Sequence, residues 1–292
     1  MNKFFKYIIP FVFCIGTFLL IKCSTGGKFE IIYLSNLNGN IEACDCYEVR
    51  LGGLHHIKPI IDDLRKKNQN LVVIDGGDTF NTYPFMELDS AVYESYKLIK
   101  PDIWVPAEQE FIEGAGFLSK VFNQVGSTFI TGNIQFKNLK TVAQKEYVYK
   151  NKKVTFTSFV QPALFDPKLR DQYVLNKSDE LIGISEALNP DNFNILIFHG
   201  DQIEFENQTQ LISKFDLILS AHQQSDQIDL ESDPPVIGGG ADGEFLAHII
   251  LQENGSGFKI SASKINVEQG NNPDKKISEI ISEYRQKIGL TE

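Results

Sequence analysis

In this 292-residue chain, four side chains of the types that bind divalent cations each lie at or just beyond the end of a short apolar run. They are Asp78, Glu108, His199 and His222. Two imidazoles and two carboxylates neutralise a divalent ion and suit manganese, iron or zinc. The sequence therefore predicts one divalent-cation site built from residues far apart along the chain.

Each of these residues also has a simpler interpretation. A histidine at the end of a strand often serves as a hydrogen-bonded structural residue, which applies to His199 and His222. Asp78 lies in a Gly-Gly-Asp-Thr turn and could cap the following helix. We favour a shared pocket because four suitable side chains occur at equivalent places along the chain.

The apolar runs predict strands that alternate with helices. Residues 54–64 carry an apolar stripe at helical spacing between the first two runs. Alternation of this kind predicts an α/β fold with a parallel or mixed sheet covered on both faces, and ligands bind beyond the carboxyl ends of such strands. The predicted strands are 29–34, 71–74, 103–105, 128–131, 154–160, 195–198 and 217–219.

The last third of the chain has a different pattern. Glycine-rich turns and alternating apolar residues from 234 to 267 predict antiparallel strands. Asn272, Pro273 and Asp274 precede apolar residues at helical spacing, which predicts a capped amphipathic helix at the end of the chain.

Five short segments follow successive predicted strands: Asn36-Leu37-Asn38-Gly39, Gly77-Asp78, Ala107-Glu108-Gln109-Glu110, His199 and Ala221-His222-Gln223-Gln224. Together they resemble the motifs of the amino-terminal domain of the 5'-nucleotidase family within the calcineurin-like metallophosphoesterases. That family has Asp-x-His-Gly, Gly-Asp, Gly-Asn-His-Glu, a lone His and Gly-His-x-His after successive strands. The resemblance implies two mixed β-sheets sandwiched between helices, in a four-layer αββα arrangement.

The resemblance implies that two cations would clamp a phosphoryl group and generate hydroxide. At the first cation only the bridging Asp78 remains, because Asn36, Asn38 and Gln224 replace charged or imidazole ligands. At the second cation Asp78, His199 and His222 are kept, and Glu108 stands in for an asparagine. We therefore expect at most one divalent cation.

The resemblance also implies that the proton donor to the leaving group has been lost. Gln109 replaces the family's histidine, whose role is generally worth about 10² to 10⁴ in rate. Glu108 or Glu110 could supply the missing proton transfer, which leaves Gln109 and Glu110 as weak candidates for catalytic residues.

The amino terminus predicts export. Residues 1–22 combine Lys3 and Lys6 with an apolar run over 7–21, as in a secretory signal. Cys23 follows directly and resembles a bacterial lipid-attachment site, although Lys22 departs from the usual small residue; an uncleaved membrane anchor is the alternative. We expect a lipidated linker over 23–27, a domain over 28–292, and a lipid-anchored protein of the bacterial cell envelope, periplasmic or on the surface.

Two further cysteines, Cys44 and Cys46, remain in the exported part. A bond between residues two apart would close a strained ring and be easily reduced. The pair could shape a loop, bind a soft metal or do redox work, and the spacing alone does not decide between these.

Net charge argues against some partners. The chain carries −10, and removing residues 1–22 takes away three lysines and no acid, which leaves −13. This acidity argues against binding to nucleic acid or to an anionic membrane surface. Three hypotheses remain: an impaired phosphoesterase relative that binds a phosphorylated small molecule or envelope protein, a working one-metal phosphoester hydrolase, and a redox or metal-handling protein.

Overall fold

Two six-stranded sheets form the centre of the protein. The computed structural model describes residues 28–43, 50–137, 139–168, 173–175, 181–255, 257–270 and 272–290. The first sheet has the order β14-β13-β1-β2-β3-β4, with β1 to β4 parallel and β13 antiparallel to both of its neighbours. Its strands are β1 (Phe29–Leu34), β2 (Leu71–Asp75), β3 (Ile103–Trp104), β4 (Thr128–Phe129), β13 (Phe245–Asn254) and β14 (Gly257–Asn266).

The second sheet has the order β11-β12-β10-β9-β7-β6, with four parallel central strands and an antiparallel strand at each edge. A separate two-stranded sheet pairs β5 (Ile134–Phe136) with β8 (Tyr173–Leu175). The strands of the second sheet are β6 (Gln144–Tyr149), β7 (Lys152–Val160), β9 (Phe193–His199), β10 (Leu217–Ala221), β11 (Ile228–Asp229) and β12 (Val236–Gly238).

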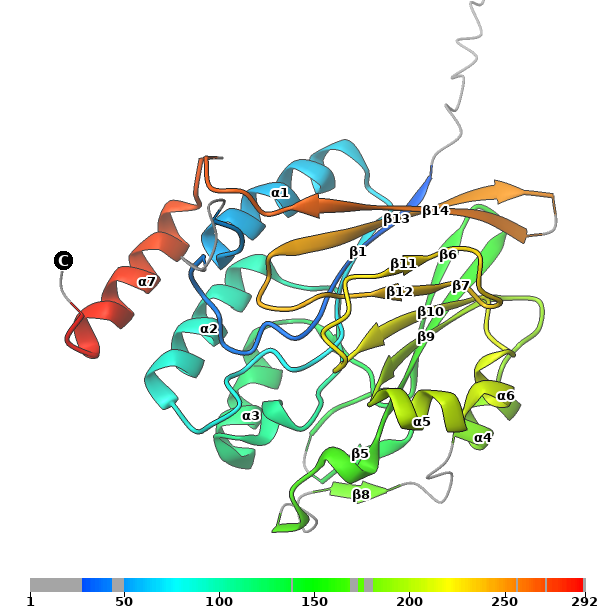
Figure 1. Cartoon of the computed structure of the whole chain (residues 1–292), viewed down its shortest axis with the longest axis horizontal. Coiled ribbons are helices and arrows are strands. Elements are labelled where there is room, and N and C mark those ends of the chain that lie inside the picture. Colours follow the sequence, from blue (N-terminus) through cyan, green and yellow to red (C-terminus); the bar gives the residue numbers. More distant parts are fainter. Residues whose placement is uncertain are drawn as a thin grey trace, which may run out of the picture.

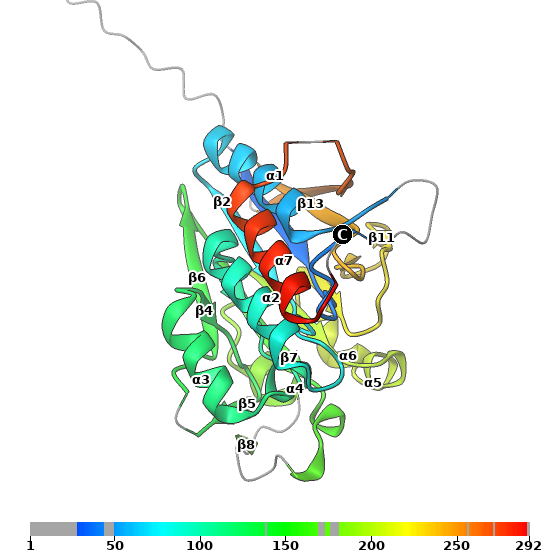
Figure 2. The ribbon, with the colours of Figure 1, turned by 90° about the vertical axis from the view of Figure 1, so that its left-hand side faces the viewer.

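Helices cover the outer face of each sheet. Figure 2 shows α1, α2 and α7 side by side against the first sheet, with α3 beside them, and Figure 1 shows α4, α5 and α6 against the second. Within the described residues, every helix is too short or too polar to cross a membrane. The helices are α1 (Leu54–Lys67), α2 (Met86–Ile99), α3 (Gly114–Gln124), α4 (Leu181–Glu186), α5 (Gln202–Asn207), α6 (Thr209–Ile212) and α7 (Lys275–Lys287), with 3₁₀ turns at Gln109–Phe111 and Pro162–Leu164.

Side-chain alternation along the strands creates three apolar layers. In β1, Ile31 and Tyr33 face the layer between the sheets, whereas Ile32 and Leu34 pack under the helices. In β9, Leu196 and Phe198 pack under the helices of the second sheet. Because successive side chains of a strand point to opposite faces, strands buried on both faces read as continuous apolar runs. The predicted four-layer α/β fold is thereby confirmed.

The carboxyl-terminal third differs partly from the prediction. β13 and β14 form the expected antiparallel pair, and β12 pairs antiparallel with β11. On its other side β12 runs parallel to β10, which the prediction of antiparallel strands from 234 to 267 did not include. Helix α7 begins after Asp274, whose side chain accepts a hydrogen bond from the Ile277 amide at 3.0 Å. This is the predicted N-cap.

Candidate metal centre

Five loops bring the candidate residues to one edge of the two sheets. Asn36 follows β1, Asp78 follows β2, Glu108 follows β3, His199 ends β9 and His222 follows β10. These are carboxyl ends of parallel strands, which is where ligands bind in such sheets. The loops thus place the candidate ligands where the sequence predicted them.

The backbone of these loops is unusual. Asn36, Asn38, Asp78, His222 and Gln224 all have positive φ angles, between 53° and 70°. Left-handed backbone is uncommon outside glycine and concentrates at functional sites, where surrounding structure must hold it. Asp78 does not cap a helix at this turn, because the next helix begins only at Met86.

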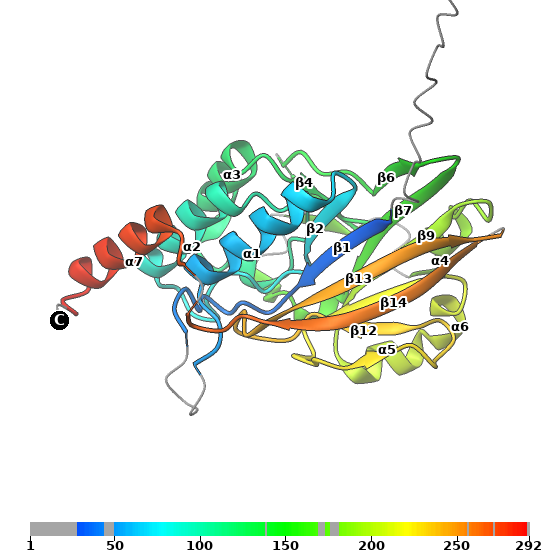
Figure 3. The ribbon, with the colours of Figure 1, turned by 90° about the horizontal axis from the view of Figure 1, so that it is seen from above.

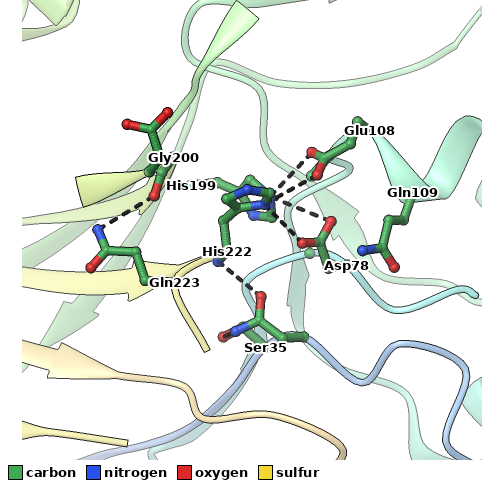
Figure 4. Close-up of polar contacts among 12 residues, drawn as sticks. Ser35, Asp78, Glu108, Gln109, His199, Gly200, His222 and Gln223 are labelled. Atoms are coloured by element: carbon green, nitrogen blue, oxygen red, sulfur yellow. Dashed lines mark hydrogen bonds and ion pairs between the residues drawn. The ribbon is translucent and has the colours of Figure 1, made fainter. Parts of the chain in front are cut away.

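Asp78, Glu108, His199 and His222 point toward one another, as Figure 4 shows, and one ligand atom from each lies within 4.8 Å of the others. His199 Nε2 lies 3.4 Å from Asp78 Oδ1 and 3.3 Å from Glu108 Oε2. His222 Nδ1 lies 3.1 Å from Asp78 Oδ2 and from Glu108 Oε1. Histidines and carboxylates therefore alternate around a common centre.

Three atoms of this group are buried without a hydrogen-bond partner among the described residues: Asp78 Oδ1, Glu108 Oε2 and His199 Nε2. Buried polar atoms normally have partners, so an orphaned set of lone pairs needs an explanation. Ligands about 2.0–2.1 Å from a tetrahedral cation lie about 3.3–3.4 Å apart. The observed histidine–carboxylate separations of 3.1–3.4 Å are of this size, but each histidine faces a different oxygen of each carboxylate. The four residues thus form a candidate site for one divalent cation.

The orientation of the His199 ring is fixed by a contact on the side away from the centre. Its Nδ1 lies 2.8 Å from the Gly76 carbonyl oxygen, so in the neutral ring Nδ1–H donates there and Nε2 presents its lone pair to the centre. Gly77 permits this approach: its φ is 99°, and a Cβ atom there would lie 3.0 Å from His199 Nδ1 and 2.8 Å from the Val105 carbonyl oxygen.

The charges of the four residues are strongly coupled. Burial lowers the pKa of His199, but the Asp78 and Glu108 carboxylates outweigh burial and raise that pKa well above its ordinary value. Hydrogen bonds to Asp78 and Glu108 raise the pKa of His222 to about 9. Burial raises the pKa of Glu108, but His199 and His222 outweigh it and lower that pKa far below its usual range. Two protons or one divalent cation would balance the two carboxylates equally well.

At the positions expected to bind the first cation, neutral amides form a closed network. Asn36 Nδ2 donates to the Gly240 carbonyl at 2.6 Å and to Ser35 Oγ at 3.1 Å, while its Oδ1 accepts from the His222 amide at 2.8 Å. Asn38 Nδ2 donates to the Asn36 carbonyl and to Asp242 Oδ1. These side-chain atoms therefore hydrogen-bond the loop after β1 to the segments that contain His222, Gly240 and Asp242.

Gln224 takes no part in the described contacts of that network; its side chain is exposed. The neighbouring Gln223 turns the other way and donates to the Gly200 carbonyl at 3.4 Å, as Figure 4 shows. At the three positions expected to bind a first cation, the amides of Asn36 and Asn38 are therefore hydrogen-bonded to the loops, and the amide of Gln224 is exposed to solvent.

The two weak catalytic candidates have different environments. Gln109 lies beside the centre in Figure 4, and its Nε2 donates to Asn38 Oδ1 at 3.4 Å. Glu110 is 1% exposed and accepts from the Thr79 amide at 2.8 Å and from the Ala107 amide at 2.7 Å. Burial, followed by the charges of Asp78 and Asp75, raises the pKa of Glu110 to about 8. Its two oxygens bridge the loops that carry Asp78 and Glu108.

Asp75 also holds the loop that carries Asp78, and the sequence pattern did not single this residue out. It accepts from the Gly77 amide at 2.8 Å, from Thr79 Oγ1 at 3.0 Å and from the Tyr96 hydroxyl at 2.5 Å. Burial raises the pKa of Asp75 to about 6. The only sequence signal was its place directly before Gly76, at the end of an apolar strand. Cys23, Cys44 and Cys46 lie outside the described residues.

Two mixed sheets flanked by helices form an α/β fold that matches the fold of a calcineurin-like phosphoesterase. No protein-family model and no curated protein matches the sequence. Solved structures do match.

Three of these structures illustrate how similar the folds are and how much of each chain matches. Thermus thermophilus sulfate thiohydrolase SoxB has a TM-score of 0.73 at 14% identity, covering 89% of this chain and 61% of that one. A 5'-nucleotidase precursor, also from Thermus thermophilus, has a TM-score of 0.71 at 11% identity, covering 90% and 59%. The calcineurin-like phosphoesterase YfkN from Bacillus subtilis has a TM-score of 0.65 at 17% identity, covering 89% and 97%. This chain therefore spans about three fifths of the first two proteins and nearly all of the third.

Proposed function

We propose that this protein binds one divalent cation through Asp78, Glu108, His199 and His222, and uses it to hold a phosphorylated ligand without turning it over efficiently. The observation that carries the proposal is the contrast within one centre. Four charged or imidazole side chains converge with orphaned lone pairs, whereas Asn36 beside them is saturated with hydrogen bonds. A bound cation would supply positive charge and open coordination positions for anionic oxygens.

Impaired turnover is supported by the lack of a suitable proton donor. Gln109 carries a neutral amide, which has no pKa near neutral pH and cannot act as a general acid. Glu110 is buried, and both of its oxygens accept backbone hydrogen bonds, so the carboxyl group serves the loops rather than a leaving group. The positions expected to bind a first cation also carry neutral amides. Two features that assist hydrolysis, the proton donor and the first cation's ligands, are therefore both missing.

The ligand class follows from the fold and the cation. The similar solved structures include a 5'-nucleotidase precursor and a calcineurin-like phosphoesterase, whose names denote action on phosphate esters. We therefore propose a phosphorylated small molecule, or an envelope protein that presents such a group, as the ligand. A working one-metal phosphoester hydrolase is the alternative.

The test uses the full-length protein and compares Asp78→Ala with Asp226→Ala, an exposed aspartate that serves as control. We expect about one manganese or zinc ion per chain by elemental analysis, cation-dependent binding of inorganic phosphate, and negligible hydrolysis of nucleotides or bis-aryl phosphates. Only Asp78→Ala should lose the cation and phosphate binding. Robust hydrolysis that Asp78→Ala abolishes would favour the hydrolase, and absence of a bound cation would overturn both.

Export and lipid attachment at Cys23 are a separate part of the proposal. They rest on the charged start, the apolar run over 7–21 and the position of Cys23. Labelling with a radioactive fatty acid should mark the wild-type protein and not Cys23→Ser. The metal content of Cys44→Ser, unchanged from wild type, would separate this function from a metal-handling role of the cysteine pair.

A further inference from the structure

One end of this acidic protein is rich in lysine. It lies where β1 begins, α1 ends and the β6–β7 and β13–β14 turns come together, and Figure 3 shows these elements at the end opposite α7. Three of its lysines pair with acids, namely Lys66 with Asp63, Lys150 with Glu253 and Lys153 with Glu146. The group, here named the lysine end, consists of Lys28, Lys66, Lys67, Lys150, Lys152, Lys153 and Lys259.

Hydrogen bonds join the two turns into one surface. Lys152 Nζ donates to the Gly255 and Gly257 carbonyls at 2.9 Å each, and Lys150 Nζ lies 2.9 Å from Glu253 Oε2. In the same way, Asn68 after α1 donates to the Lys28 carbonyl at 3.1 Å, which brings the end of α1 to the start of β1.

Aromatic rings lie beneath these lysines. Lys152 Nζ is 5.3 Å from the centre of the Phe258 ring, and Lys150 Nζ is 5.4 Å from that of Tyr149. The neighbouring Val148 is 70% exposed on β6. Lysines with aromatic and aliphatic side chains between them are typical of surfaces that lie on lipid headgroups.

The sequence before the lysine end points to the same partner. The apolar run over residues 7–21 is separated from Lys28 by residues 22–27 alone. Six extended residues span about 20 Å at most. If the apolar run or a lipid on Cys23 enters a membrane, the lysine end must lie close to that surface.

We propose that the lysine end docks on anionic phospholipid headgroups, so that the candidate metal centre faces away from the membrane. The net charge of −13 argued against such contact, but charge acts locally when its two signs are separated along the molecule. His199, Asp78 and the loops that carry them lie at the opposite ends of the same strands. This inference rests on membrane anchoring and does not depend on cation binding.

The test places one tryptophan at each end of the full-length protein. Val148→Trp marks the lysine end, and Ile203→Trp on α5 marks the end that carries the metal centre; the two native side chains are 70% and 71% exposed. Trp104 is buried and contributes the same background to both variants. In vesicles of brominated phosphatidylcholine and phosphatidylglycerol, we expect Val148→Trp to be quenched and Ile203→Trp to be spared, with the quenching reversed by high salt.

Charge variants provide the second arm. Changing Lys150, Lys152 and Lys153 to glutamine should weaken docking roughly 100-fold, since each lysine near an anionic surface contributes about fivefold. Because Lys152 also holds the turn, a second set at Lys66, Lys67 and Lys259 should act in the same direction. The control changes three exposed lysines away from that end, namely Lys120 on α3, Lys168 after the 3₁₀ turn that follows β7 and Lys287 at the end of α7, and should have no effect. Equal quenching at both ends, no quenching at Val148→Trp, or equal effects of all three sets would overturn the proposal.

Discussion

Two halves of one centre differ in chemistry although both lie at the same edge of the two sheets. In the half that contains His199 and Glu108, charged and imidazole groups converge and leave buried lone pairs without partners among the described residues. In the half that contains Asn36 and Asn38, amides donate and accept among the loops. A carboxylate can only accept hydrogen bonds, whereas an amide can also donate. Replacing Asp by Asn therefore turns a position that needs a cation into one that stabilises the loops without it.

The two halves are distinguished most sharply by changing one side chain in each. Asp78→Asn should lower cation affinity by about 100-fold or more, because losses even among outer-shell partners of metal ligands cost about 10- to 100-fold. Asn38→Ala, in the other half, should leave the affinity unchanged. Titration calorimetry with manganese or zinc measures both. Similar losses in the two variants would show that the halves share one function.

A smaller effect on cation affinity is expected at Glu110, whose carboxyl group bridges the loops that carry Asp78 and Glu108. Glu110→Gln replaces one accepting oxygen with a donor that faces a backbone N–H group, so we expect about a 10- to 100-fold loss of cation affinity. The free energy of unfolding should fall by about 1–3 kcal/mol. Glu113→Gln, on the same loop, is the control.

The proton-transfer hypothesis makes a different prediction for the same variant. If Glu110 acted as the acid, Glu110→Gln would lower a measurable rate by about 10²-fold or more and remove one limb of its pH profile, with cation affinity preserved. Loss of affinity without a change in the shape of the pH profile identifies a positioning residue.

The sequence predicted the fold well where strands are buried on both faces. β1, β2, β7 and β9 appear as continuous apolar runs, and the alternation of strands with helices indicated the layers. Strand β6 was missed because it reads Gln-Lys-Glu-Tyr-Val-Tyr and lies at an edge, where polar residues are accommodated. Strand partners were also hard to predict, because nothing in the three residues of β12 specifies that it pairs in parallel with β10 as well as antiparallel with β11.

The candidate site was predictable in position more than in detail. Ligand types at strand ends identified Asp78, Glu108, His199 and His222 before any geometry was known. The hydrogen bonds of Asn36 join it to residues 186 and 204 positions away, and they depend on left-handed loops that pattern alone does not reveal. The role of Glu110 was equally hidden, because its partners are backbone amides.

The amide half can be tested by restoring a charge to it. Asn36→Asp loses the donor to Gly240 and Ser35 and places a carboxylate 2.6 Å from a carbonyl oxygen, so the free energy of unfolding should fall by about 1–3 kcal/mol. Asn40→Asp loses a donor at an exposed position and should cost less. Chemical denaturation measures both. A second bound cation in Asn36→Asp would instead mean that this half still binds metal.

The smallest effect concerns a buried carboxylate outside both halves. Burial raises the pKa of Asp89 to about 7; its Oδ1 accepts from the Asn81 amide at 2.8 Å, and Oδ2 has no hydrogen-bond partner among the described residues. Because the folded pKa lies above the unfolded value near 3.8, the folded state holds the proton more tightly. The free energy of unfolding must therefore fall as pH rises from about 4 to about 7.

Asp89→Asn keeps an acceptor for Asn81 and removes the charge, so it should raise the free energy of unfolding at pH 8 by about 1–2 kcal/mol and have little effect near pH 4. Denaturation across this pH range provides the measurement, with exposed Asp191→Asn as the control. A buried carboxylate without a cation thus destabilises the protein at neutral pH. An Asp89→Asn variant that is less stable than wild type at pH 8 would show that the charge of this carboxylate is compensated by its surroundings.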